Sequence, residues 1–117
     1  MIRTLIVDDH KIVRQGLMQI LGETPDICVV GEAGNGREAL QQLRVAGTDV
    51  VLLDISMPDM DGMATMLALK REHPKLPVLV LSMYPEEQYA IRFLKVGAAG
   101  YLTKESAADE LIEAIRK

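Results

Sequence analysis

Short apolar runs alternate with amphipathic segments along the whole chain, and this alternation limits the possible folds more than any other feature of the sequence. The apolar-rich runs are residues 4–7, 27–33, 50–54, 78–82 and 100–103, and a segment with helical spacing of apolar residues follows each of them. Strands without polar alternation are typical of a parallel sheet that helices cover on both faces. The pattern therefore predicts an α/β fold: a doubly wound, five-stranded parallel sheet with five helices. The strand order expected for it is 2-1-3-4-5, one of the common orders of such sheets.

Apolar spacing and capping residues predict where the helices begin and end. The first helix is expected to present one apolar face, made by Ile12, Val13, Leu17, Ile20 and Leu21. Asn35, with Glu38 three residues later, is typical of a helix N-cap. Gly97 is expected to end the helix before the fifth strand, and Ser106 to begin the last helix.

Length and composition exclude several classes of protein. The 117 residues suit one domain, 1–117, with one core. A net charge of −4 argues against nucleic acid binding by this segment, because phosphate contacts need a clustered basic face. The single cysteine, Cys28, excludes a disulfide within the monomer and is expected to be a buried thiol. No apolar run is long enough to span a membrane and the N-terminus does not read as a signal peptide, so we expect a cytoplasmic protein.

Polar side chains gather where the predicted strands end. An acid pair follows the first strand, an acid ends the third, a hydroxyl ends the fourth and a lysine follows the fifth: Asp8, Asp9, Asp54, Ser82 and Lys104. Because the carboxyl ends of parallel strands lie at one edge of a sheet, we expect these side chains to lie close together. Ligands of open α/β sheets bind at that edge where the strand order reverses, which is here between the first and third strands.

Three carboxylates at one sheet edge would repel one another strongly. At a separation of about 5 Å and an effective dielectric constant of about 20, each pair costs ~3 kcal/mol, and three pairs cost on the order of 10 kcal/mol. Lys104 could offset only part of that repulsion. Either one acid binds a proton or a divalent cation sits among them, and oxygen ligands shared with phosphate suit Mg²⁺. The cluster therefore indicates a Mg²⁺ site that handles phosphate.

Each of these residues also has a purely structural explanation when it is taken alone. Asp8 or Asp9 could cap the first helix, and Asp54 could close an Asx-turn. Ser82 could be an ordinary hydroxyl at a strand end, and Lys104 a solvated lysine. Their joint occurrence at the ends of four strands favours the functional interpretation.

Several segments of the sequence carry a resemblance to a known family. The segments LIVDDH (5–10), LLDISMPDMDG (52–62), VLVLS (78–82) and GYLTK (100–104) together resemble the receiver domain of bacterial two-component response regulators, over essentially the whole chain. VDDHKIVRQGL (7–17), VGEAGNGREAL (30–40) and residues 96–116 resemble its NarL/FixJ (LuxR-type) class. The resemblance implies a CheY-like, that is flavodoxin-like, fold. In that class a C-terminal helix-turn-helix DNA-binding domain follows the receiver, and we expect it to lie outside these 117 residues.

The resemblance implies a role for the residues at the sheet edge. Asp54 would accept a phosphoryl group from a phosphohistidine of a sensor histidine kinase. Asp8, Asp9 and Asp54, with the backbone carbonyl of Ser56, would bind Mg²⁺, and Lys104 would pair with a phosphoryl oxygen. A receiver of this kind phosphorylates itself and loses the phosphate slowly, so it is not expected to be a turnover enzyme.

Further positions match the family's switch and tuning residues. Ser82 would donate a hydrogen bond to the phosphoryl group, and Tyr101 would swing inward as Ser82 moves. Ser56 and Tyr84 occupy positions that tune autodephosphorylation. Phosphorylation would promote a homodimer and so control transcription. Its interface would be the first and last helices, which we favour, or the fourth helix, fifth strand and last helix.

One position departs from the family pattern. Many receivers have a proline after the lysine, usually with a cis peptide bond, whereas Glu105 follows Lys104 here. A cis bond without proline costs about 3 kcal/mol. The Lys104–Glu105 bond is therefore expected to be trans.

Three other functions compete with the receiver. A flavin-binding module of the same fold predicts a phosphate loop rich in serine, threonine and glycine after the first strand, where DDHKIVRQG stands. A hydrolase that resembles the haloacid dehalogenases needs an acid two residues after its nucleophile, where Ser56 stands. A degenerate receiver that serves only as an interaction module conflicts with an intact set of Asp8, Asp9, Asp54, Ser82 and Lys104.

Overall fold

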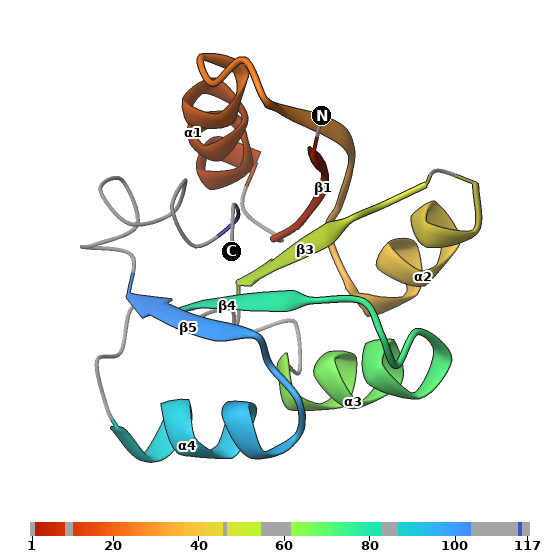
Figure 1. The fold of residues 1–117 in the computed structure, drawn as a ribbon, viewed down its shortest axis with the longest axis vertical. Helices are drawn as coiled ribbons and strands as arrows, with labels where there is room; N and C mark the ends of the chain where they lie inside the picture. Colours follow the sequence, from red (N-terminus) through yellow and green to blue (C-terminus); the bar gives the residue numbers. More distant parts are fainter. Residues whose placement is uncertain are drawn as a thin grey trace.

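Strands and helices alternate along the chain in the computed structural model, which describes residues 2–8, 11–45, 47–54, 62–82, 87–103 and 115 (Figure 1). In chain order the elements are β1 (Ile2–Val7), α1 (Lys11–Gly22), β2 (Ile27–Ala33), α2 (Gly36–Val45), β3 (Val50–Asp54), α3 (Gly62–Glu72), β4 (Val78–Ser82), α4 (Glu87–Lys95) and β5 (Gly100–Thr103). The β/α alternation predicted from the sequence is confirmed.

All strand pairs in the sheet are parallel, and the order is β2-β1-β3-β4-β5. This order confirms the prediction. Four of the five expected helices lie among the described residues. The fifth, expected to begin at Ser106, lies outside them except for Ile115, which is helical and buried.

Side chains of β1, β3 and β4 alternate between two apolar layers, one on each face of the sheet. One layer joins Leu5, Val7, Val51, Leu53, Val78 and Val80 to α2, α3 and α4 through Ala39, Met66, Leu69 and Phe93. The other joins Ile6, Leu52, Leu79 and Leu81 to α1 through Leu17 and Leu21, and it includes Ile115. Figure 1 shows the same arrangement, with α1 on one side of the sheet and α2, α3 and α4 on the other. Burial on both faces explains why these strands read as continuous apolar runs.

Two details of the apolar pattern differ from the prediction. Leu17 and Leu21 of α1 are buried, but Ile12 is 84% exposed. A helix turns about 100° per residue, so Ile12 lies about 140° around the helix from Leu17 and outside the face that packs on the sheet. Cys28 was expected to be buried and is only partly so.

The helix ends at Asn35 and Gly97 follow the predicted capping chemistry. Asn35 Oδ1 accepts a hydrogen bond from the Glu38 amide at 2.9 Å, and Glu38 Oε2 accepts one from the Gly34 amide at 2.9 Å. After α4, the Ala98 amide donates to the Phe93 carbonyl at 3.0 Å, and Gly97 has a φ of 106°. These are the features of a Schellman motif, in which glycine alone takes the left-handed conformation without strain.

An exposed ion pair fastens β1 to β3 at the amino edge of the sheet. The Arg3 guanidinium donates to both carboxylate oxygens of Asp49, at 3.2 and 3.1 Å, and the Arg3 amide donates to Asp49 Oδ2 at 2.8 Å. The side-chain hydrogen bond from Arg3 is the main reason that the pKa of Asp49 lies below its ordinary value. The same bond raises the pKa of Arg3.

Candidate functional site

Two buried carboxylates lie side by side where β1 and β3 end. Val7 of β1 is paired with Leu53 of β3. The next residues are Asp8, which directly follows β1, and Asp54, which ends β3. Asp8 is 0% exposed and Asp54 is 1% exposed. Neighbouring strands are about 4.8 Å apart, so the two acids face the same small volume at the carboxyl edge.

This place is also the topological switch point of the sheet. The chain leaves β1 toward β2 through α1, and it leaves β3 toward β4 through α3, on the other face and in the opposite direction (Figure 1). In sheets of this kind ligands bind at the switch point, beyond the carboxyl ends of the strands. Asp8 and Asp54 lie at this point, where the sequence analysis expected them.

Two further strands bring predicted positions to the same edge. Asp54 is paired with Leu81, so Ser82 follows one step beyond on β4, and Ser82 is paired with Thr103 on β5. Lys104 follows Thr103 directly in the chain. The structure thus places the backbone of Ser82 next to the strand that leads to Lys104.

Some predicted site residues lie outside the part of the chain that the structure describes. They are Asp9, Ser56, Tyr84 and Lys104, together with the Lys104–Glu105 bond. Their roles stay predictions.

The predicted switch residue Tyr101 is half-buried on β5. Its ring centroid lies 6.5 Å from that of Phe93 on α4, with the ring planes inclined by 39°. Tyr101 packs against the apolar layer that contains α2, α3 and α4. This is one packed position of the ring, and the role of Tyr101 as a switch stays a prediction.

Arg14 of α1 is a site residue that the sequence analysis missed. Its Nη1 donates to the Asp8 carbonyl oxygen at 2.6 Å. Its Nε lies 3.2 Å from Glu32 Oε1, which makes an ion pair that is not aligned as a hydrogen bond. A signal was present, since Arg14 precedes Leu17 and Leu21 by three and seven residues and therefore shares their helix face.

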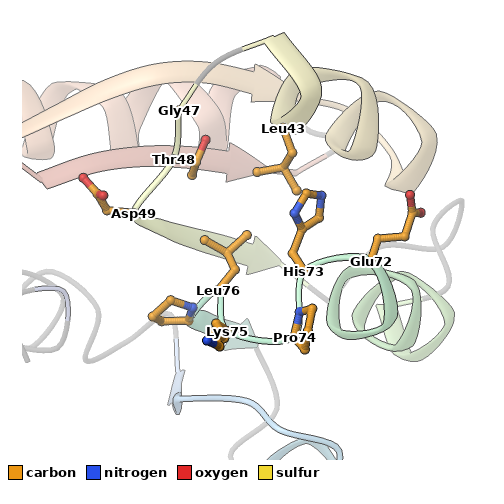
Figure 2. A pocket seen from close by; sticks show the side chains of 10 residues that line it. Leu43, Gly47, Thr48, Asp49, Glu72, His73, Pro74, Lys75 and Leu76 are labelled. Carbon is orange, nitrogen blue, oxygen red and sulfur yellow. The ribbon is translucent and has the colours of Figure 1, made fainter.

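A hollow of about 550 Å³ lies far from these acids, at the amino edge of the sheet (Figure 2). The segments just before β3 and β4 line it, with Asp49, Glu72, His73 and Lys75 among them. It contains none of the predicted site residues. The candidate site is therefore the switch point at the opposite edge.

The carboxylate oxygens at the switch point fit a magnesium ion. Two carboxylates on neighbouring strand ends are the hard oxygen ligands that Mg²⁺ takes in combination with water and phosphate oxygens. No group of three histidine, cysteine, aspartate or glutamate side chains gathers within the described residues. The third predicted carboxylate, Asp9, lies outside them.

Comparison with known proteins decides the family. Residues 4–116 match the family model described as "Response regulator receiver domain". The chain belongs to this family. It is 40% identical over 116 residues to the response regulator GacA of Pseudomonas viridiflava, an alignment that covers 99% of this chain and 54% of that protein. The chain thus spans about half the length of this curated relative.

Solved structures agree with the family and its subclass. A LuxR family two-component response regulator from Aurantimonas sp. SI85-9A1 has a TM-score of 0.90 and 32% identity, over 97% of this chain and 81% of that one. The receiver domain of the putative response regulator NarL from Mycobacterium tuberculosis has a TM-score of 0.87 and 35% identity, over 98% and 93%. RcsB from Salmonella enterica serovar Typhimurium, bound to promoter rprA in the presence of phosphomimetic BeF₃⁻, has a TM-score of 0.88 and 28% identity, over 99% and 60%. The chain is a receiver of the NarL/FixJ type.

The family match removes two of the alternatives. Neither a flavin-binding module nor a dehalogenase-like hydrolase is consistent with a receiver family match that covers residues 4–116. The described part of the chain also contains no helix that is both long and apolar enough to cross a membrane. The degenerate receiver, which keeps the fold but not the chemistry, is the alternative that an experiment must address.

Proposed function

We propose that this receiver accepts a phosphoryl group on Asp54 from a phosphohistidine of a sensor histidine kinase, in a reaction that needs Mg²⁺. A carboxylate oxygen of Asp54 attacks phosphorus, the phosphorus–nitrogen bond breaks, and the imidazole leaves with its electron pair and takes up a proton. The observation that carries the proposal is the burial of Asp54 beside Asp8 at the switch point. Burial holds the nucleophile in place and excludes competing water.

Phosphoryl transfer depends on positioning and charge neutralisation more than on covalent help from the protein. Asp8, Asp9 and Asp54, with the carbonyl of Ser56, would hold the metal. When bound, Mg²⁺ supplies positive charge against the acids and the phosphoryl oxygens. Lys104 is proposed to neutralise a further phosphoryl oxygen. Each molecule would accept a single phosphoryl group, on Asp54, and would not act as a turnover enzyme.

The response to phosphorylation is proposed to pass through Ser82 and Tyr101. A phosphoryl group on Asp54 adds charge and acceptor oxygens one strand away from Ser82, whose hydroxyl can donate to them. Movement at Ser82 would change the space around Tyr101, which now packs near Phe93. Ser56 and Tyr84 would set the rate at which the phosphate is lost.

The output is proposed to be control of transcription in the cytoplasm, through a homodimer and a C-terminal helix-turn-helix domain. One exposed apolar residue on α1, Ile12, supports an interface of the first and last helices. Ile91 and Leu94 of α4 are about half exposed and support the other surface. A sedimentation series on the phosphorylated protein that showed monomer at every concentration would exclude both interfaces.

Titration of ¹⁵N-labelled protein with Mg²⁺ and then with beryllofluoride, which mimics the acyl phosphate, tests the proposal. We expect Mg²⁺ to shift the amide signals of Asp8 and Asp54, and beryllofluoride to shift those of Ser82 and Tyr101 only when Mg²⁺ is present. Asp54→Asn should lose the second response, whereas the control Asp49→Asn, at the other edge of the sheet, should keep it. A folded wild type that responds to neither reagent would be a degenerate receiver.

A further inference from the structure

Both backbone polar groups of Asp8 are tied to other elements. Its amide donates to the Ala33 carbonyl of β2 at 2.9 Å, and its carbonyl accepts from Arg14 Nη1 at 2.6 Å. The carbonyl belongs to the peptide unit that leads from β1 to the predicted metal ligand Asp9. The orientation of the Asp8 carbonyl is therefore held by the guanidinium of Arg14.

The Arg14 side chain is only 17% exposed and has close neighbours on β2 and just after it. Glu32, near the end of β2, forms an ion pair with Nε at 3.2 Å. The turn after β2 approaches so closely that a Cβ on Gly34 would lie 3.2 Å from Nη1. Glu38 Oε2 in turn anchors the Gly34 amide at 2.9 Å. A guanidinium suits this place, because one side chain can donate to the Asp8 carbonyl and also set its charge beside the Glu32 carboxylate.

We propose that Arg14 is a positioning residue for Mg²⁺ binding, which acts by fixing the Asp8 carbonyl and hence the backbone of Asp8, whose side chain is a predicted metal ligand. This inference rests on the proposed function. Groups that orient a metal ligand typically change metal affinity by about 10- to 100-fold when they are removed. Because Arg14 holds a backbone carbonyl and not a ligating carboxylate, we expect an effect near the lower end, of about tenfold.

The sign of the effect separates positioning from simple electrostatics. Removal of a positive charge beside Asp8 would strengthen cation binding if Arg14 acted only through its charge. Loss of the hydrogen bond that orients the Asp8 carbonyl would weaken cation binding instead. Arg14→Gln therefore distinguishes the two roles, and Arg14→Lys, which keeps the charge and one donor, should restore part of the affinity.

The experiment measures the Mg²⁺ dissociation constant of the wild type and of Arg14→Gln, Arg14→Lys and Arg44→Gln by calorimetry. Arg44→Gln is the matched control, because it removes an arginine–glutamate pair between α2 and α3 (Arg44 with Glu72, 3.6 Å) away from the site. We expect dissociation constants raised about tenfold for Arg14→Gln, raised less for Arg14→Lys, and unchanged for Arg44→Gln. An unchanged or lowered constant for a folded Arg14→Gln would overturn the proposal.

A readout without metal keeps this inference separate from the proposed function. The ¹³C carbonyl shift of Asp8 and the exchange rate of its amide report on the two backbone bonds in metal-free protein. Both should change in Arg14→Gln and stay constant in Arg44→Gln. If the wild type bound no Mg²⁺, the proposed function would fail and the Asp8 signals alone would decide whether Arg14 holds the backbone. If Mg²⁺ bound equally to wild type and Arg14→Gln, the proposed function would remain consistent with the data, but Arg14 would have no positioning role in Mg²⁺ binding.

Discussion

Asp8 and Asp54 are buried acids in a region whose other buried side chains are almost all apolar. Two carboxylates about 5 Å apart repel by ~3 kcal/mol at an effective dielectric constant of about 20. A fold that keeps such a pair is less stable than it would be with one acid replaced by a neutral group of equal shape. The repulsion is the cost of a site that attracts a divalent cation.

Asp54→Asn should therefore stabilise the metal-free protein. In EDTA we expect its free energy of unfolding to exceed that of the wild type by about 1–3 kcal/mol, measured by urea denaturation. Mg²⁺ should stabilise the wild type, by about 2.7 kcal/mol at 100 times the dissociation constant, and the variant much less. A metal-free Asp54→Asn that was less stable than the wild type would show that the pair does not repel as described.

Asp49→Asn makes the same chemical change at the other edge of the sheet. It should lower the free energy of unfolding, whereas Asp54→Asn should raise it in the metal-free protein. Arg3 lowers the pKa of Asp49 below its ordinary value of 3.8, so the folded state prefers the ionised acid. The stabilisation is fully present above pH 3.8 and is lost as the pH falls through the lower pKa of the folded state. Urea midpoints from pH 7 to pH 3 should show a small deficit for Asp49→Asn that begins to shrink as the pH falls below 3.8, and a deficit that is independent of pH would contradict this origin.

At the scale of single elements, the two glycines Gly16 and Gly97 have different roles. Gly97 ends α4 with a φ of 106°, and a Cβ there would lie 2.9 Å from Lys70 Cε. Gly16 lies inside α1 and is exposed, and a Cβ there would have no other atom within 4 Å beyond its own helix backbone and chain neighbours. Gly97→Ala should cost about 1–2 kcal/mol, and Gly16→Ala should stabilise by about 0.5–1 kcal/mol. Thermal or urea unfolding measures both, and equal effects of the two changes would contradict the assignment of the Gly97 turn.

The elements also show where prediction from sequence reaches its limit. Asn35, Glu38 and Gly97 were predictable because a cap depends on neighbours within a few residues. The exposure of Ile12 could be read from helix geometry, but only after the buried face had been fixed by Leu17 and Leu21. Spacing alone does not predict the burial of an apolar residue that lies far around the helix from the residues of the buried face. Tertiary packing decides which face of the helix is buried.

Arg14 shows the same limit for polar residues. Its partners, the Asp8 carbonyl and Glu32, come from two strands, and one of them is a backbone group that no sequence motif marks. The position of Arg14 on the buried face of α1 was the available signal. Which carbonyl it would reach depends on how α1 lies across β1 and β2.

At the scale of the whole molecule, the position of the site was predictable once a strand order was assumed. Continuous apolar strands require helices on both faces, and right-handed crossovers with the order β2-β1-β3-β4-β5 then bring the ends of β1 and β3 together. Asp8 and Asp54 follow from that topology. The tilt of the Tyr101 ring against Phe93 does not follow from the topology, because it depends on the packing of α4 against β5.

The central claim is that Asp54 is a Mg²⁺-dependent phosphoryl acceptor, and intact mass spectrometry after incubation with acetyl phosphate tests it most directly. With Mg²⁺, the wild type and the control Asp49→Asn should each gain one phosphoryl group. Neither the EDTA-treated wild type nor Asp54→Asn should gain any. An adduct that persisted in Asp54→Asn, or a folded wild type that bound Mg²⁺ and gained none, would contradict the account.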